Sequence, residues 1–252
     1  MDYICPQSAP QDQAAPYGSG MPGWKRWIDL SCCVAALPLF LLCTLFMTLM
    51  TWLVSPGPVF FCQERVGHRG RRFKIFKFRT MSAGADTQRH QNYFKELIQS
   101  NAPMVKLDTQ RDARLIPGGW LLRASGLDEL PQLINVLRGE MSVVGPRPCI
   151  PSENENYLPH QRERFNAMPG LTGLWQVSGK NRTTFEEMIR LDIHYSRHVS
   201  LTMDLRIILT TLPALLIQID DTRRRRKAAV AASPGVPASI LVASEIIQPF
   251  RI

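Results

Sequence analysis

The longest uncharged stretch of the chain runs from Leu30 to Val54 and spans twenty-five residues. About 20 consecutive apolar residues are enough to cross the hydrocarbon core of a bilayer as a helix. Pro38 lies about a third of the way along the stretch, where it removes one backbone hydrogen bond and bends a helix. The sequence therefore predicts a membrane-embedded helix that is broken at Pro38.

Basic residues flank this stretch on both sides. Lys25 and Arg26 precede it, and seven Lys or Arg residues follow it in the segment 65–79. Because Lys and Arg collect on the cytoplasmic side of membranes, positive charge at both ends favours a re-entrant helix over residues 24–54 that enters and leaves by the same face. The alternative is an ordinary kinked single span with its N-terminus outside.

The positive charge of the chain is concentrated beside its apolar segments. The whole sequence has a formal net charge of +9; residues 24–79 hold nine basic and two acidic residues, and residues 223–227 add five positive charges. The block between them, residues 80–222, is nearly neutral, with fifteen basic and sixteen acidic residues. This distribution indicates contact with anionic membrane lipids and argues against a nucleic-acid partner.

The two ends of the chain have the composition of unstructured segments. Residues 1–23 are rich in Pro, Gln, Gly and Ser, and residues 223–252 combine the polybasic run with an Ala-, Pro- and Val-rich tail. We expect disorder in residues 1–23 and in the tail after the polybasic run. The six cysteines include no C-x-x-C pair, so reduced thiols are expected, without a disulfide framework or a zinc site.

Residue spacing predicts the secondary structure between these ends. Residues 59–66 and 73–78 have the character of two short strands around a turn at 67–70, which gives a small β-hairpin. Apolar residues at helical spacing predict helices in the segments 86–100, 128–139, 182–197 and 201–219. In the last segment the uncharged run is too short to cross a bilayer, so an amphipathic helix should lie on the membrane or pack on the core. The predicted fold class is α+β and mostly helical.

Two adjacent carboxylates, Asp128 and Glu129, fall in the first turn of a predicted helix, with Ser125 or Gly126 near its cap. The helix dipole favours ionised carboxylates at that position. An ionised carboxylate can attack phosphorus, and a second one can hold a divalent cation. Acidic residues in a first helical turn are also ordinary helix chemistry, so the pair alone leaves a structural and a catalytic role open.

Two further segments have the chemistry of a phosphate site. Gly145–Pro148 places Arg147 in a rigid backbone, as a fork for phosphate, although a Pro-rich turn with a solvated Arg has the same sequence. Residues 169–182 are Gly-rich and basic but do not have P-loop spacing. This loop could still receive the phosphates of a nucleotide, with Lys180 and Arg182 as candidate ligands.

Asp192 lies in a cluster of polar residues with His194 and His198. The two histidines are four residues apart and could share a helical face, which is a spacing found in zinc sites. No third ligand accompanies them, so we expect no metal there.

The order of these motifs resembles the bacterial sugar transferases, which are small monotopic polyprenyl-phosphate phosphoglycosyl transferases. The resemblance covers about residues 24–220 and consists of many motifs in one order: Lys25-Arg26 with Asp29, Ser55–Phe61, Gln63–Gly67, Lys77–Met81, Leu127–Gln132, Arg138–Ser142, Gly145–Pro148 and Pro169–Gly179. One departure is Gly126, where a Ser often precedes the Leu-Asp-Glu of the family. That departure puts a capping hydroxyl in doubt, and it leaves the acidic pair in place.

The resemblance implies roles for individual residues. Asp128 would be the nucleophile, and Glu129 would be its partner at a Mg²⁺ site that both carboxylates form. The positions that would line the substrate pocket are Arg123, Arg147 and Asp192, together with Lys77 and Arg79.

The resemblance also implies a reaction and a location. A hexose-1-phosphate would pass from a UDP-sugar to polyprenyl (undecaprenyl) phosphate with release of UMP, through a covalent intermediate on Asp128, to initiate exopolysaccharide or related glycan assembly. The protein would be monotopic in the bacterial inner membrane, with residues 55–222 as a cytoplasmic catalytic domain, and it could form a homodimer. The alternative is a non-catalytic membrane adaptor of a glycan-assembly complex. No motif identifies the hexose.

Overall fold

The computed structural model of the protein describes residues 22–81, 115–179 and 183–231. The predicted helix at 86–100, residues 1–21 of the predicted tail 1–23, and the tail beyond residue 231 lie outside these ranges; Gly23, expected in the tail, begins a helix. The candidate ligands Lys180 and Arg182 also lie outside them.

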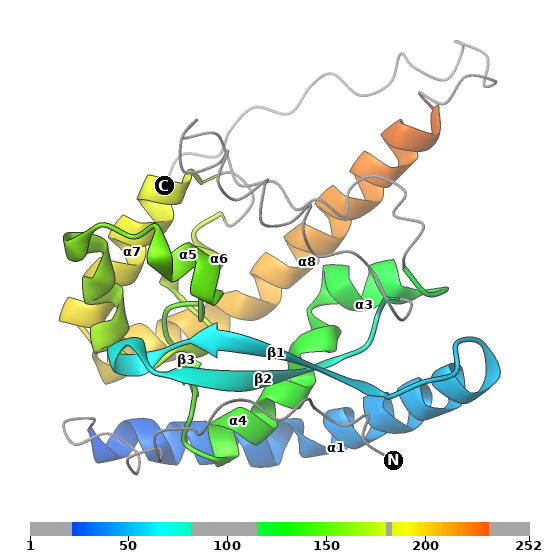
Figure 1. Cartoon of the computed structure of the whole chain (residues 1–252), viewed down its shortest axis with the longest axis horizontal. Helices are drawn as coiled ribbons and strands as arrows, with labels where there is room; N and C mark the ends of the chain where they lie inside the picture. The colour runs from blue at the N-terminus through cyan, green and yellow to red at the C-terminus, as the bar shows by residue number, and fades with distance from the viewer. Residues whose placement is uncertain (1–21, 82–114, 180–182, 232–252) are drawn as a thin grey trace.

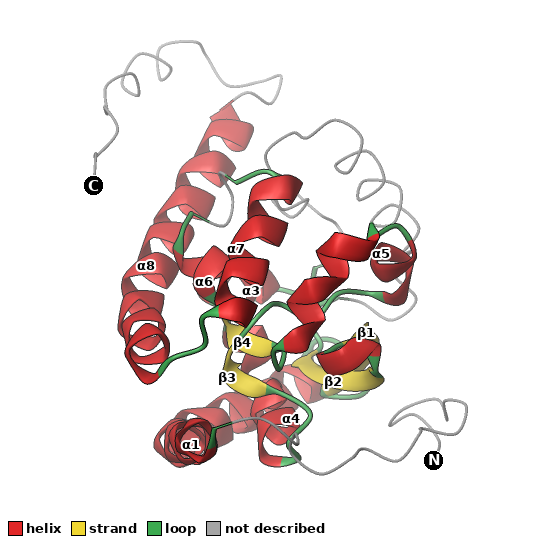
Figure 2. Ribbon diagram, turned by 90° about the vertical axis from the view of Figure 1, so that its left-hand side faces the viewer, coloured by secondary structure: helices red, strands yellow, loops and turns green. Residues whose placement is uncertain are grey.

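The described chain is mostly helical, with a long helix along one edge of the molecule and another along a second edge (Figures 1 and 2). Strands β1 and β2 form an antiparallel hairpin, and β3 and β4 form a short parallel pair. The elements in chain order are α1 (Gly23–Leu53), β1 (Phe60–Val66), η1 (His68–Gly70), β2 (Arg72–Phe78), α3 (Gly119–Ser125), η3 (Leu127–Gln132), α4 (Leu133–Leu137), β3 (Ser142–Val144), α5 (Pro151–Glu155), η4 (Pro159–Asn166), β4 (Gly170–Thr172), α6 (Leu174–Val177), α7 (Phe185–Arg197) and α8 (Leu201–Ala231).

Helix α1 packs on the rest of the protein along its whole length. Its buried positions recur every four residues from Lys25 to Cys33 and again from Cys43 to Thr51, with the partly buried Ala36 and Phe40 between them, which is the spacing of one helix face. Cys33 packs with residues of β2 and α4, and Met47 packs with Phe78 and Ile116. The opposite face leaves large apolar side chains exposed, among them Val34, Leu37, Leu41, Leu42, Leu45, Leu49 and Trp52.

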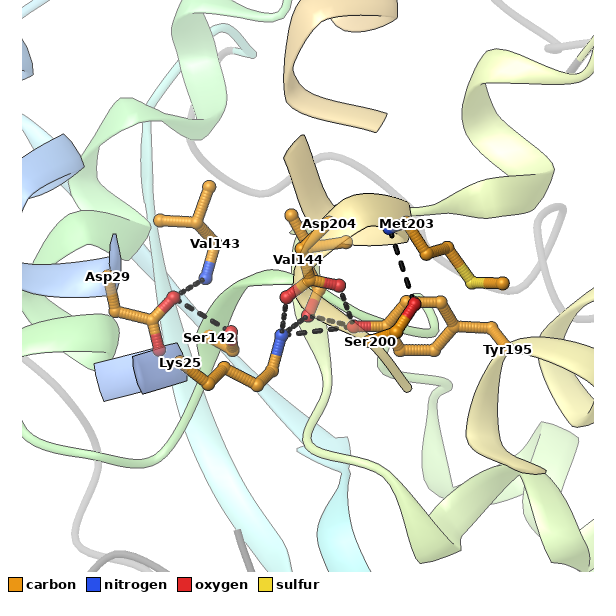
Figure 3. A network of polar contacts seen from close by, with 9 residues as sticks. All are labelled: Lys25, Asp29, Ser142, Val143, Val144, Tyr195, Ser200, Met203 and Asp204. Carbon is orange, nitrogen blue, oxygen red and sulfur yellow. Dashed lines mark hydrogen bonds and ion pairs between the residues drawn. The ribbon is translucent and has the colours of Figure 1, made fainter. Parts of the chain in front are cut away.

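Lys25 holds the start of α1 inside a buried polar network (Figure 3). Its Nζ donates to the carbonyl oxygen of Val144 at 2.9 Å and to the hydroxyl of Tyr195 at 3.0 Å, and it forms an ion pair with Asp204 at 2.5 Å. The Tyr195 hydroxyl in turn donates to Asp204 at 2.7 Å. The side chains of Lys25 and Asp204 are each only 1% exposed, so the network joins α1, β3, α7 and α8 away from solvent.

Two other polar residues of α1 fix the same end of the helix. Arg26 donates to the carbonyl oxygens of Val136 and Leu137, at 2.6 and 2.8 Å, and so satisfies carbonyls at the C-terminal end of α4. Asp29 accepts hydrogen bonds from the Ser142 hydroxyl and from the Val143 backbone N–H, both at 2.8 Å. The apolar helix is therefore attached to α4 and β3 by charged side chains.

The hairpin β1–β2 lies against α4 through the fully buried Asn135. The Asn135 amide nitrogen donates to the Lys74 carbonyl oxygen at 2.7 Å and to the Glu140 carboxylate at 2.6 Å. Its oxygen accepts from the Phe76 N–H at 3.2 Å. The predicted hairpin is confirmed, and its turn includes Arg69 with a positive φ of 55°.

Helix α8 runs along another edge of the molecule (Figure 2) and packs against α3, α6, β3 and β4. It is longer than predicted and continues through the polybasic run to Ala231, into the segment expected to be a tail. Among the described residues two helices, α1 and the segment Leu201–Arg224 of α8, are long and apolar enough to cross a membrane. Exposed apolar residues on α8 include Leu205, Leu209, Leu212 and Leu216.

The structure differs from the sequence expectations at two other places. Pro38 lies inside one continuous helix, Gly23–Leu53, so the described backbone is helical on both sides of it; the re-entrant path stays a prediction. Cys62 on β1 is disulfide-bonded, so the expectation of six reduced thiols is wrong at that residue. Cys32, Cys33, Cys43 and Cys149 are free thiols.

The packing of α1 can be tested by truncating side chains on its two faces. Met47→Ala removes a fully buried side chain and should lower the free energy of unfolding by about 2–5 kcal/mol. Leu45→Ala, on the exposed face of the same turn, should change it by less than about 0.5 kcal/mol. Thermal unfolding in one detergent compares the two; equal melting temperatures would contradict the packing described for α1.

Candidate active site

The predicted acidic pair lies at the start of the continuous helical segment formed by η3 and α4. Gly126 adopts a left-handed conformation with φ of 74°, which an L side chain rarely adopts, and it turns the chain from α3 into η3. The Ser125 hydroxyl bonds back to the Leu121 carbonyl oxygen at 2.8 Å, and no side chain caps η3. Asp128 is 9% exposed, whereas Glu129 is half-buried.

Glu129 is held by Lys77 of the hairpin. Lys77 Nζ lies 2.9 Å from Glu129 Oε1, and both side chains are partly accessible. The pair connects the last part of β2 to the first turn of η3, and these two elements pack together. The structure thus places Lys77 beside the acidic pair.

The Arg147 segment follows β3 and is pressed against the chain around β4. Gly145 N–H donates to the Thr172 carbonyl oxygen, and Gly170 N–H donates to the Pro146 carbonyl oxygen, both at 2.9 Å. A Cβ atom on Gly145 would lie 2.0 Å from the Met168 carbonyl oxygen, so no side chain fits there. The Gly145–Pro148 motif and the first part of the Gly-rich segment 169–182 therefore form one tightly packed unit.

Donors from four elements hold the carbonyl oxygens of this segment. The Val144 oxygen accepts from Lys25, and the Pro146 oxygen accepts from β4. The Arg147 oxygen accepts from Arg164 of η4 at 2.9 Å, the Pro148 oxygen from Arg65 of β1 at 3.2 Å, and the Cys149 oxygen from Val66 N–H at 2.8 Å. A backbone with so many fixed carbonyls presents Arg147 from a rigid support.

Asp192 lies beneath the Arg147 segment as part of a buried ion pair. Arg164 Nη2 is 2.5 Å from Asp192 Oδ2, and both side chains are 2% exposed. Arg164 also donates to the Tyr157 hydroxyl at 2.6 Å. Burial raises the pKa of Asp192 to about 6, against the opposing effect of the Arg164 charge. The structure brings Asp192 to the site through Arg164, on the inner side of the Arg147 segment.

The other two arginines predicted to line the pocket lie in different parts of the chain: Arg79 follows β2, and Arg123 lies in α3. The Arg79 guanidinium is buried and donates to the Pro58 carbonyl oxygen at 2.9 Å, and to the Ser55 hydroxyl and carbonyl oxygens. Arg79 thereby fixes the turn that follows α1. Arg123 lies in the last turn of α3, shortly before η3.

The predicted loop over residues 169–182 is structured where it is described. It forms β4 and the short helix α6, and the Trp175 indole N–H donates to the Thr183 hydroxyl at 2.6 Å. His194 and His198 on α7 stack with ring centroids 4.5 Å apart. In the described ranges no three His, Cys, Asp or Glu side chains form a metal-binding group.

The two carboxylates at η3 fit a magnesium ion that is bound partly by the protein and partly by a substrate. Mg²⁺ commonly binds to proteins through one or two carboxylates, with waters and substrate phosphates completing its shell. Asp128 and Glu129 provide two adjacent carboxylates at a helix start, of which Glu129 is partly accessible. They would therefore hold the ion together with a phosphate substrate, and they do not form a closed protein cage.

Comparison with known proteins identifies the family. The model of the family described as "Bacterial sugar transferase" matches residues 21–218. The chain belongs to the bacterial sugar transferase family. This confirms the resemblance inferred from the motifs, and with it the prediction of an enzyme.

Several similar proteins are named for exopolysaccharide production or for sugar-phosphate transfer. This sugar transferase is 38% identical over 200 residues to the exopolysaccharide production protein ExoY of Sinorhizobium fredii, across 77% of this chain and 85% of that protein. It is 39% identical over 200 residues to the UDP-glucose:undecaprenyl-phosphate glucose-1-phosphate transferase of Caulobacter vibrioides, across 76% and 69% of the two chains. It is 34% identical over 200 residues to the undecaprenyl-phosphate galactose phosphotransferase of Salmonella typhimurium, across 76% of this chain and 40% of that protein.

Sequence reasoning missed two buried arginines of this sugar transferase, Arg65 and Arg164. Both donate to carbonyl oxygens of the Arg147 segment. Arg65 belongs to the motif Gln63–Gly67 that carried part of the resemblance, which was a signal for it. Arg164 lies in the charged run of η4, where nothing in the local sequence distinguishes it from its exposed neighbours.

The burial of Asp192 predicts a loss of stability on substitution. Asp192→Asn leaves Arg164 buried without its counter-charge and should cost about 3 kcal/mol in the free energy of unfolding. Glu163→Gln removes an ion pair with Arg197 that is exposed on both sides and should cost at most about 1 kcal/mol. Chemical denaturation measures both; a small, equal effect of the two substitutions would contradict the structural role of Asp192.

Proposed function

We propose that this sugar transferase moves a hexose-1-phosphate from a UDP-sugar to polyprenyl phosphate and releases UMP. The named substrates of its relatives, UDP-glucose and undecaprenyl phosphate in one case, support the two substrate classes. The name of the exopolysaccharide production protein supports a role in starting exopolysaccharide or related glycan assembly. The adaptor alternative is not favoured, because relatives over most of the chain are named as transferases.

The observation that carries the proposal is the position of Asp128. Its carboxylate is largely buried at the start of η3, next to Glu129 and its partner Lys77. The rigid Arg147 segment contacts β1, the neighbouring strand of the hairpin that carries Lys77. A carboxylate in such a place can act as a nucleophile while nearby cations receive the charge of a diphosphate.

The reaction then proceeds in two displacements at one phosphorus atom. A carboxylate oxygen of Asp128 attacks the sugar-bearing phosphorus, and the bond to the UMP oxygen breaks as UMP leaves. A phosphate oxygen of the polyprenyl phosphate next attacks the same phosphorus and displaces Asp128 as a free carboxylate. The product is a polyprenyl-diphosphate hexose. A magnesium ion on Asp128 and Glu129 would neutralise diphosphate charge in this site.

The packing of α1 supports a monotopic position at the membrane. The first turn of α1 is attached to β3, α7 and α8 through Lys25, and its last turns pack on Phe78 and Ile116. A helix of 31 residues is about 46 Å long at 1.5 Å per residue, so a simple span would put its ends on opposite sides of the bilayer. Because both ends contact the same domain, we propose that α1 is seated in one leaflet, on the cytoplasmic side of the inner membrane.

The nucleophile is tested by Asp128→Asn, which keeps the shape of the side chain and removes its charge. Turnover of UDP-sugar with undecaprenyl phosphate should fall by several orders of magnitude, as measured by UMP release over a panel of UDP-sugars. Wild-type enzyme given UDP-sugar alone should carry a phosphosugar adduct in intact-protein mass spectrometry, and Asp128→Asn should not. Glu129→Gln is the matched neighbour, with lower turnover but an intact adduct site. Near-normal turnover of Asp128→Asn would remove the assignment.

Membrane topology is tested with single cysteines at two exposed positions, one in the first turn of α1 and one after the helix. Gly23→Cys and Arg71→Cys, in a background without native cysteines, should both resist an impermeant maleimide in intact spheroplasts. Both should react once the membrane is permeabilised. Labelling of Gly23→Cys alone in intact spheroplasts would indicate a single span and would refute the monotopic arrangement.

A further inference from the structure

Arg65 is a buried cation of the hairpin beside the candidate active site. It is 4% exposed, and its register opposite Phe73 puts it on the same hairpin face as Lys77, which lies opposite Phe61. Its guanidinium donates to the Pro148 carbonyl oxygen at 3.2 Å and to the Gln63 side chain at 2.7 Å. Arg65 therefore reaches from β1 of the hairpin to the Arg147 segment.

No carboxylate of the described ranges lies within ion-pair distance of Arg65. The other buried cations that hold the Arg147 segment are paired, Lys25 with Asp204 and Arg164 with Asp192. In addition, the Nε–H of Arg65 is buried and has no hydrogen-bond partner. A buried charge without a counter-charge is expensive, so its presence points to an anion that binds during function.

The charges around Arg65 indicate where this anion belongs. Burial and, after it, the Arg147 charge lower the pKa of Arg65 to about 10, while Glu153 and Glu129 oppose both effects. The guanidinium stays protonated at neutral pH. Two cations, Arg65 and Arg147, are thus held near each other and near Glu129, an arrangement that an anion between them would stabilise.

We infer that Arg65 supplies the fixed positive charge of a diphosphate site that it forms with Arg147 beside Glu129. This inference rests on the proposed function, in which the diphosphate is that of the nucleotide sugar. Arg147 is the accessible arm of the site. Arg65 is its buried part: it fixes the Pro148 carbonyl oxygen and adds a charge that forms no ion pair with a carboxylate of the described residues.

The test separates anion binding from protein stability in full-length, detergent-solubilised protein. Inorganic pyrophosphate is titrated by calorimetry in the presence of a chelator, so that Asp128 and Glu129 hold no metal ion. Arg65→Met should weaken pyrophosphate binding by at least about tenfold, since a charge-assisted interaction is lost. Arg65→Lys keeps the charge and should retain most of the affinity. The melting temperature of ligand-free Arg65→Met should be retained or raised, because an unpaired buried charge has been removed.

Arg164→Met is the matched control, since it also removes a carbonyl donor of the Arg147 segment but leaves Asp192 unpaired. It should lower the melting temperature clearly. The inference is overturned if wild type does not bind pyrophosphate, if Arg65→Met binds it as well as wild type does, or if Arg65→Met loses as much thermal stability as Arg164→Met. UDP is titrated in parallel: binding of pyrophosphate without binding of UDP would refute the nucleotide-sugar donor and leave the anion site standing.

Discussion

The ion pair between Lys25 and Asp204 is the interaction on which the arrangement of the molecule depends. It lies where the first turns of the two long helices, α1 and α8, meet the end of β3. Its surroundings are fully buried, and the Tyr195 hydroxyl and the Val144 carbonyl oxygen satisfy the remaining hydrogen bonds of the ammonium group. Because an unpaired buried charge is costly, moving either long helix away would leave the charge on the other helix buried without its partner.

The network around Lys25 also contacts the candidate active site, because Lys25 binds the carbonyl oxygen of Val144. The segment that follows β3 carries Arg147, and its carbonyl oxygens are held by α1, β4, η4 and β1. Asn135 holds the hairpin against α4, in the helical segment that begins with the acidic pair. Helix α1, the acidic pair and the Arg147 segment are thus parts of one packed body. In this sugar transferase the same buried network fixes both the position of α1 and the position of the Arg147 segment.

Local pattern was enough to predict the hairpin, the apolar helix and the acidic helix start, since each depends on residues close in sequence. The roles of Asp192 and Arg79 could not be predicted from local sequence, because their contacts depend on distant segments. Asp192 pairs with Arg164, and Arg79 donates to the turn at Ser55. The unpaired state of Arg65 is likewise invisible in a sequence. Pro38 was expected to break its helix, yet the described backbone stays helical around it, as the packing of Cys33 and Met47 on either side favours.

The separation of Lys25 from Asp204 in the chain, 179 positions, has a consequence for biosynthesis. During translation α1 emerges first, and the partners of its three polar anchors, Lys25, Arg26 and Asp29, emerge more than a hundred residues later. Until then these side chains lack the partners that they have in the folded protein, and charged groups of this kind enter hydrocarbon at high cost. In the proposed arrangement, with α1 in one leaflet, the residues that later anchor the helix would therefore also oppose its movement across the bilayer while its domain is being made.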